Sequence, residues 1–289
     1  MKSLRVFLNM VRFEHTIFAL PFAYLGMLMG ARGWPPAENG WPTWGQFFWI
    51  TVAMAAARTA AMSFNRYIDR QMDAHNPRTA MRDIPKGRIS ANTVLFYALL
   101  SLAVLLLAAW ILNPLCFILA LPAMLFLVGY SYTKRFTWLC HWILGATDGL
   151  AAAGGWIAVT GTIDPPAWTL WLAVTVWIAG FDLIYACQDI EFDRAYGIHS
   201  YPARFGVAAG LRMAQAMHLL TVVALAATGF LMGLGWPYWL GLLAVAGLLI
   251  YEHSLISPAD LSKLGFAFFN VNGYIAVTIF VATLLAVAL

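Results

Sequence analysis

The apolar stretch VLFYALLSLAVLLLAAWIL, residues 94–112, decides the fold, because it contains no charged side chain. A helix needs about 20 consecutive apolar residues to cross the hydrocarbon core of a membrane, and this stretch is long enough. The pair Asn113-Pro114 ends it, and a second apolar run begins directly afterwards. Two such runs in succession predict neighbouring membrane-spanning helices that are joined by a tight turn.

The rest of the chain has the same character. Hydrophobic residues make up 62% of the 289 residues and charged residues 10%, whereas soluble domains carry roughly 25% charged residues. This composition excludes a soluble globular enzyme, and it excludes disorder, which requires a low apolar content. The net charge of +4 is too small to indicate a nucleic-acid partner. Three cysteines lie in or beside apolar stretches, which predicts buried thiols rather than disulfides or metal ligands.

Polar breaks divide the chain into nine predicted spans, so we expect an all-α, multi-pass membrane protein with a single domain over residues 1–289. The spans are predicted at residues 14–31, 46–64, 92–112, 114–132, 139–160, 168–187, 208–232, 236–252 and 265–288. The basic N-terminus and its apolar run are also typical of a signal peptide. No small-residue cleavage site leads into a hydrophilic chain, which favours a first span.

The basic residues alternate with these spans. Of the 17 Lys and Arg side chains, 15 fall on the N-terminus and the even-numbered connections, whereas Arg32 falls on the other side and Arg58 inside a span. Cytoplasmic loops carry an excess of Lys and Arg. The distribution therefore predicts a cytoplasmic N-terminus and a C-terminus outside.

A first acidic segment, residues 65–73, stands at the cytoplasmic end of the second predicted span. Asn65, Asp69 and Asp73 follow each other at four-residue intervals, which places all three on one face of a helix. Carboxylates at this spacing repel each other and need compensation. One interpretation is a solvated helix end neutralised by Arg66 and Arg70; the other is a binding site.

A second acidic segment, residues 182–193, ends the sixth predicted span. Asp189 and Asp193 again lie four residues apart, and Asp182 stands two turns earlier, inside an apolar helix. An ionisable side chain at membrane depth is costly and indicates function. Because the second and sixth spans both run inward, we expect the two acidic segments at the same membrane face.

The chemistry of these side chains indicates magnesium. Carboxylate oxygens without Cys or His partners favour Mg²⁺, which usually binds substrate phosphates as well. A basic set completes the pattern, because Tyr130, Lys134 and Arg135 end the fourth predicted span and could bind phosphoryl oxygens. The alternative for Lys134 and Arg135 is a simple cytoplasmic anchor. The implied ligand is a diphosphate held through Mg²⁺.

Arg58 is a different case, since it lies inside the apolar sequence MAAARTAAM, two turns before Asn65. A cation at this depth should face a cavity and pair with an anion. The two interpretations are a substrate contact and a structural salt bridge with Asp148 or Asp182.

The connection between the second and third spans is long and basic. We name residues 76–88, NPRTAMRDIPKGR, the 76–88 loop. It is either an ordinary charged loop or a lid that excludes water from the diphosphate site.

Together these motifs carry a family resemblance. The paired segments Asn65-x3-Asp69-x3-Asp73 and Asp182-x2-Tyr185-x2-Gln188-Asp189-x3-Asp193, the 76–88 loop and Tyr130-x3-Lys134-Arg135 resemble UbiA-type intramembrane prenyltransferases. The opening Glu14–Pro21 resembles bacterial members that prenylate 4-hydroxybenzoate. The similarity covers essentially the whole chain in order.

The resemblance implies nine helices around a central cavity that opens laterally to lipid. It implies a bacterial inner-membrane enzyme that uses Mg²⁺ to transfer a polyprenyl group from polyprenyl diphosphate to a hydroxylated aromatic acid. The leading acceptor is 4-hydroxybenzoate, in quinone biosynthesis of the ubiquinone type. The alternatives are a naphthoate of menaquinone biosynthesis and, in another class of protein, a membrane transporter that uses the carboxylates as relays.

The resemblance also implies residue roles. It assigns metal binding to Asp69, Asp73, Asp189 and Asp193, and catalysis to Asp182, Asp189 and Lys134. Asp182 or Asp189 would stabilise a carbocation or accept a proton. It places Asn65 and Asp182 in support of the metal, Tyr130 and Lys134 at the diphosphate, and Arg58 facing the acid group of the acceptor. We further predict substrate binding by Asn65, Arg66, Arg70, Arg135, Tyr185 and Gln188.

Overall fold

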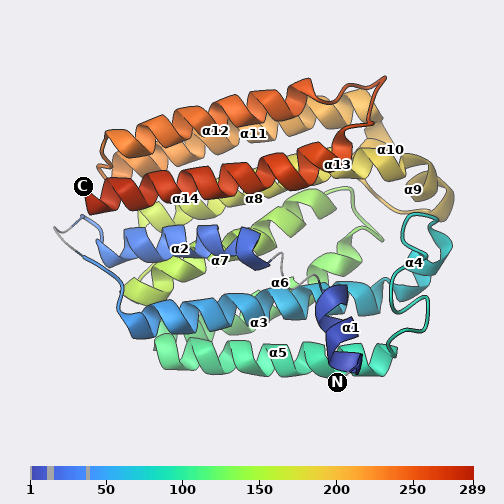
Figure 1. Cartoon of the computed structure of the whole chain (residues 1–289), viewed down its shortest axis with the longest axis horizontal. Helices are drawn as coiled ribbons and strands as arrows, with labels where there is room; N and C mark the ends of the chain where they lie inside the picture. The colour runs from blue at the N-terminus through green and yellow to red at the C-terminus, as the bar shows by residue number, and fades with distance from the viewer. Residues whose placement is uncertain (1, 12–15, 37–39) are drawn as a thin grey trace.

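The structure is a computed structural model, and it describes residues 2–11, 16–36 and 40–289. Long helices run side by side and form one bundle (Figure 1). They are α2 (Thr16–Ala31), α3 (Trp44–Ile68), α5 (Ala91–Leu112), α6 (Pro114–Thr133), α7 (Cys140–Thr160), α8 (Pro165–Ala186), α11 (Val207–Leu231), α12 (Trp236–Ser254) and α14 (Asn272–Ala288). The all-α, multi-pass membrane fold that we predicted is confirmed.

Each of the first eight predicted spans corresponds to one of these helices, whereas the ninth, residues 265–288, covers α13 (Leu264–Phe266), the π-helix η3 (Ala267–Val271) and α14. Within the described residues, 7 helices are long and apolar enough to cross a membrane. The first and eighth predicted spans correspond to α2 and α12, which are outside that set, so the count of nine remains a prediction. Glu14 and His15, in the first predicted span, lie outside the described residues.

Asn113 explains why two adjacent apolar runs form separate helices. It ends α5, and its side-chain Oδ1 accepts a hydrogen bond from the backbone N–H of Cys116, which caps the start of α6 at Pro114. Its Nδ2 donates to the Ile157 carbonyl of α7 at 2.8 Å. One side chain thus ends a helix, begins the next and attaches the corner to a third.

Small residues allow the central helices to approach each other closely. A Cβ added to Gly155 of α7 would stand 2.1 Å from the Ala23 carbonyl oxygen of α2, and a Cβ on Gly145 would stand 2.1 Å from the Thr175 carbonyl oxygen of α8. Membrane helices commonly pack through small residues in this way. The outer surface carries exposed apolar side chains such as Leu125 and Phe230, as a lipid-facing surface requires.

The short elements mark the charged end of the bundle. The helices α4 (Arg70–His75), α9 (Ile190–Tyr196) and α10 (Tyr201–Phe205) lie together at the right of Figure 1, and the C-terminus lies at the opposite end. The remaining short elements are α1 (Lys2–Met10), η2 (Cys187–Asp189), α13 (Leu264–Phe266) and the π-helix η3 (Ala267–Val271). All three cysteines are free as predicted, although only Cys187 is fully buried.

Candidate active site

The first acidic segment crosses a helix break. The helix α3 ends at Ile68, Asp69 adopts φ −88° and ψ 1°, and α4 begins at Arg70. The helical spacing nevertheless continues, because the Asp73 N–H donates to the Asp69 carbonyl at 2.7 Å. The Asn65 side chain donates to Asp69 Oδ2 at 3.0 Å. The predicted proximity of Asn65 and Asp69 is therefore found, on a helix that breaks rather than continues.

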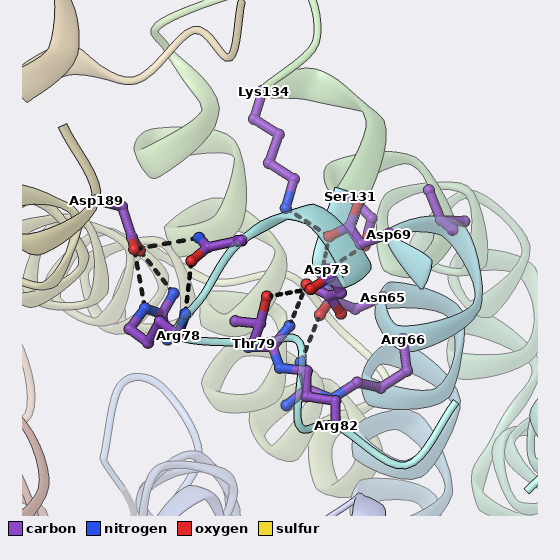
Figure 2. Close-up of polar contacts among 12 residues, drawn as sticks. Asn65, Arg66, Asp69, Asp73, Arg78, Thr79, Arg82, Ser131, Lys134 and Asp189 are labelled. Carbon is purple, nitrogen blue, oxygen red and sulfur yellow. Dashed lines mark hydrogen bonds and ion pairs between the residues drawn. The ribbon is translucent and has the colours of Figure 1, made fainter. Parts of the chain in front are cut away.

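Asp69 is compensated by two cations from the end of α6. Lys134 Nζ lies 2.5 Å from Asp69 Oδ2, and Arg135 Nη2 lies 3.0 Å from Oδ1. The Asp69 side chain is only 1% exposed. Figure 2 shows Lys134 reaching Asp69 beside Ser131, whose hydroxyl accepts from Asn65 at 3.3 Å. The basic set predicted at the end of the fourth span thus lies against the first acidic segment.

The 76–88 loop connects the two acidic segments. Arg82 Nη1 lies 2.6 Å from Asp73 Oδ1, whereas Arg78 donates to both Asp189 oxygens, at 2.9 and 2.6 Å. Figure 2 shows both arginines extending from this loop toward their carboxylates. Arg78 also donates to the Tyr185 hydroxyl at 3.0 Å. Residue-by-residue reasoning assigned no role to Arg78 or Arg82, although the basic character of the loop was a signal.

The second acidic segment also crosses a break. The helix α8 ends at Ala186, the 3₁₀ turn η2 follows, and α9 begins at Ile190. Asp193 accepts a hydrogen bond from the Ser200 hydroxyl at 2.6 Å. Asp182, deeper in α8, lies 2.6 Å from His141 Nδ1. The sequence indicated neither partner: His141 lies 41 residues before Asp182, and Ser200, seven residues after Asp193, lies beyond the end of α9.

Three predicted binding residues bond to their own segment. Arg66 donates to the Asn65 side chain at 3.3 Å. Arg70 donates to the Tyr67 carbonyl at 2.6 Å, and Gln188 donates to the Tyr185 carbonyl at 2.9 Å. Of these three, only Arg66 lines the large cavity inside the bundle. Arg70 and Gln188 bond to backbone carbonyls of their own segments and do not line that cavity.

A cavity of about 1180 Å³ runs through the bundle. Pockets for small ligands usually measure roughly 300–1,000 Å³, so this space suits a larger apolar molecule. Its wall is mostly apolar, and its polar lining includes Arg58, Asp148, Asp182, Tyr130, Tyr185, Arg66, Arg78 and Arg82. Asp69, Asp73, Asp189 and Asp193 are not among the described residues that line it. The arginines that bind Asp73 and Asp189 line it instead.

Arg58 lies in this cavity with two carboxylates. The charges of Arg58 and Asp182 both act on Asp148, which is also a cavity residue. The interaction of Arg58 with Asp148 agrees with the interpretation of Arg58 as a structural partner. The position of Arg58 in the cavity wall agrees with its interpretation as a substrate contact, and a single guanidinium can have both roles.

The aspartates fit a metal ion, although the described residues bring no group of three or more His, Cys, Asp or Glu side chains together for one. Asp69, Asp73 and Asp189 instead accept from Lys or Arg. The Asp73 Oδ2 atom is buried and has no hydrogen-bond partner. A buried carboxylate oxygen of this kind is a suitable ligand for a hard cation such as Mg²⁺.

This geometry defines a class of protein: a membrane-embedded helical enzyme with a large apolar cavity and a charged mouth. We use the word mouth for the part of the cavity that Arg78 and Arg82 line. The UbiA prenyltransferase family matches residues 19–274. The 4-hydroxybenzoate octaprenyltransferase of Cupriavidus necator is 32% identical, over 100% of this chain and 99% of that protein. The enzyme of the same name from Tolumonas auensis is 32% identical over 86% of this chain and 87% of that protein. The chain therefore belongs to the UbiA prenyltransferase family and is a prenyltransferase.

Solved structures agree. The apo structure of a UbiA homolog from Aeropyrum pernix K1 has a TM-score of 0.84 at 29% identity, over 94% of this chain and 98% of that one. A UbiA homolog from Archaeoglobus fulgidus, bound to GPP and Mg²⁺, has a TM-score of 0.69 at 19% identity, over 98% and 100%. The second likeness shows the common fold.

Proposed function

We propose that this prenyltransferase transfers a polyprenyl group from polyprenyl diphosphate to 4-hydroxybenzoate, with Mg²⁺, in quinone biosynthesis of the ubiquinone type. The observation that carries the proposal is one cavity with an apolar wall, a cationic mouth lined by Arg78 and Arg82, and Arg58 on a membrane-spanning helix in the cavity wall. The names of the relatives from Cupriavidus necator and Tolumonas auensis support the choice of acceptor.

The diphosphate occupies the mouth of the cavity. Arg78 and Arg82 line the cavity there while they bind Asp189 and Asp73. A diphosphate offers the same kind of charged oxygen acceptor, so these arginines and Lys134 can donate to it when the loop closes over it. Asp69, Asp73, Asp189 and Asp193 are the proposed Mg²⁺ ligands. When bound, Mg²⁺ neutralises charge on the leaving diphosphate.

The prenyl chain occupies the apolar part of the cavity. The bond between the allylic carbon and the diphosphate oxygen breaks, and the diphosphate keeps the electron pair. The resulting cation needs a dry site, because water would trap it. A ring carbon ortho to the acceptor hydroxyl forms the new carbon–carbon bond, and the ring then loses a proton. Asp182 or Asp189 stabilises the cation or accepts that proton.

The acceptor lies deeper, with its carboxylate at Arg58. A guanidinium is permanently charged and binds carboxylates through two parallel hydrogen bonds. A naphthoate acid of menaquinone biosynthesis has the same anionic group, so it is the second candidate acceptor. A transporter would use the carboxylates as relays without releasing diphosphate.

The test is a product analysis. Purified protein receives one labelled prenyl diphosphate, Mg²⁺ and a panel of hydroxylated aromatic acids, and mass spectrometry identifies the prenylated product. We expect Mg²⁺-dependent diphosphate release and prenylated 4-hydroxybenzoate. If a prenylated naphthoate is the only product, the acceptor is a naphthoate rather than 4-hydroxybenzoate. If no acceptor supports Mg²⁺-dependent release of diphosphate, the proposal is contradicted.

We also propose a cytoplasmic N-terminus and a C-terminus outside, in the bacterial inner membrane, from the distribution of Lys and Arg. An epitope inserted at Gly87 should react only from the cytoplasm, and one after Leu289 only from outside. Gly87 is exposed, whereas the nearby Thr79 is buried and donates to the Asp73 carbonyl. Reaction of both epitopes from the same side would contradict this topology.

A further inference from the structure

Asp182 has a different kind of partner from the other charged carboxylates at the mouth. Asp69 and Asp189 accept from Lys or Arg side chains. Asp182 accepts from His141 Nδ1 at 2.6 Å, and it lines the cavity. The His141 side chain is only 3% exposed, so the packing of α7 and α8 holds it against Asp182.

The second nitrogen of His141 determines where its proton lies. The backbone N–H of Tyr201 donates to His141 Nε2 at 3.2 Å. A backbone amide can only donate, so Nε2 must carry a lone pair and the proton must lie on Nδ1. His141 Nδ1 then donates to Asp182. The acceptor of this bond is a carboxylate in the cavity wall.

Tyr201 belongs to a short strap that holds several site residues. The strap consists of His199, Ser200 and Tyr201. The His199 N–H donates to the Lys134 carbonyl at 2.7 Å, and the Ser200 hydroxyl donates to Asp193 Oδ2 at 2.6 Å. Three consecutive residues thus attach the end of α6, the second acidic segment and His141 to one another.

We propose that His141 is a positioning residue that orients the Asp182 carboxylate toward the allylic carbon, with the backbone of Tyr201 selecting the tautomer. This inference rests on the proposed function, in which Asp182 or Asp189 stabilises the cation. Asp189 is neutralised by two hydrogen bonds from Arg78. Asp182 instead accepts from His141 and lines the cavity, so it is the carboxylate placed to face a developing carbocation, and His141 directs it.

The first test compares two substitutions at one position. His141→Leu removes both hydrogen bonds and should lower kcat on the order of 10- to 100-fold, while KM for each substrate changes less than about threefold. His141→Asn keeps a donor at the δ position and should recover most of the kcat. If the His141→Leu protein does not insert into the membrane, His141→Gln takes its place in the test. The amide of Gln lies at the ε position, so this variant has no donor at the δ position. Ser254→Ala, at the exposed end of α12, is the control and should leave kcat unchanged.

A double-mutant cycle then shows whether His141 acts through Asp182. Once Asp182→Asn has removed the charge, His141→Leu should cause no further loss of kcat. An equal loss in both backgrounds, a normal kcat for His141→Leu, or no recovery with His141→Asn would each overturn the inference. A normal kcat for Asp182→Asn alone would instead remove the proposed role of Asp182, and this inference with it.

Discussion

Each acidic segment has two aspartates four residues apart and a helix break, yet the two segments differ in the partners of their carboxylates. In the first, Asp69 and Asp73 accept from Lys134, Arg135 and Arg82. In the second, Asp189 accepts from Arg78, whereas Asp193 accepts from a serine hydroxyl and Asp182 from a histidine.

The difference teaches that spacing alone does not determine the electrostatic role of a carboxylate. The first segment is neutralised by cations that lie beside the proposed diphosphate position. In the second segment Arg78 neutralises Asp189, whereas Asp182, in the cavity wall, accepts from His141. A reaction that separates an anionic leaving group from a carbocation needs both kinds of environment.

The largest expected effect comes from removing one carboxylate of each segment. Asp69→Asn and Asp189→Asn should each lower turnover on the order of a thousandfold, because each removes a charge from the site. They should differ in stability. Asp69→Asn leaves Lys134 and Arg135 without their anion and should lower the free energy of unfolding by about 2 kcal/mol. This is less than for fully buried pairs, because those cations are 30% and 32% exposed.

Thermal unfolding in detergent measures this difference. Asp189→Asn should unfold near the temperature of the wild type, since Asp189 is 15% exposed and water can reach its arginine. Asp260→Asn, on an exposed loop, is the control and should change neither property. Equal destabilisation by Asp69→Asn and Asp189→Asn would remove the distinction between the two segments.

Arg58 should separate the acceptor from the diphosphate. Arg58→Ala should lower kcat/KM for a carboxylated acceptor by about 1.5–3 kcal/mol, the range for a hydrogen bond to a charged group. The KM for prenyl diphosphate should change little, because the proposed site of that substrate is at the mouth and away from Arg58. If Arg58 has only the structural role of an ion pair with Asp148, Arg58→Ala should lower the stability of the protein and should lower kcat/KM equally for both substrates. Initial rates with each substrate varied in turn distinguish these outcomes.

The loop arginines test whether the 76–88 loop is a lid. Arg78→Gln and Arg82→Gln should each raise KM for prenyl diphosphate about tenfold, since each loses a charged donor at the mouth. Burial lowers the pKa of Arg78 and the hydrogen bond to Asp189 raises it, with a net rise, so this donor stays charged at any working pH.

Arg88→Gln is the matched control in the same loop. Arg88 pairs with Asp83 at 3.3 Å and is 56% exposed, so its substitution should have no effect on KM. Equal effects of all three arginine variants would show that the loop contributes only general positive charge.

The smallest expected effect is that of the strap on the second segment. Ser200→Ala removes the hydroxyl that donates to Asp193 and should lower kcat about three- to tenfold. Ser254→Ala is the control, because Ser254 is exposed and donates to a backbone carbonyl of its own helix. An unchanged kcat for Ser200→Ala would show that Asp193 needs no support from the strap.

The sequence by itself determined the architecture and the identity of the acidic segments. Apolar runs without charge can be stable only in a membrane, where each helix satisfies its own backbone hydrogen bonds, so the helices could be located from residue type alone. The four-residue spacing of Asn65 and Asp69 is a local property, and the structure retains it.

Only the tertiary structure decided which partner each carboxylate has. The assignments of Arg82 to Asp73, Arg78 to Asp189 and His141 to Asp182 depend on how distant helices and a loop are packed. It also placed Arg70 and Gln188 against their own backbones. Periodicity describes one helix at a time, whereas charge compensation is a property of the whole bundle, and a cation can come from any segment that packing brings within reach.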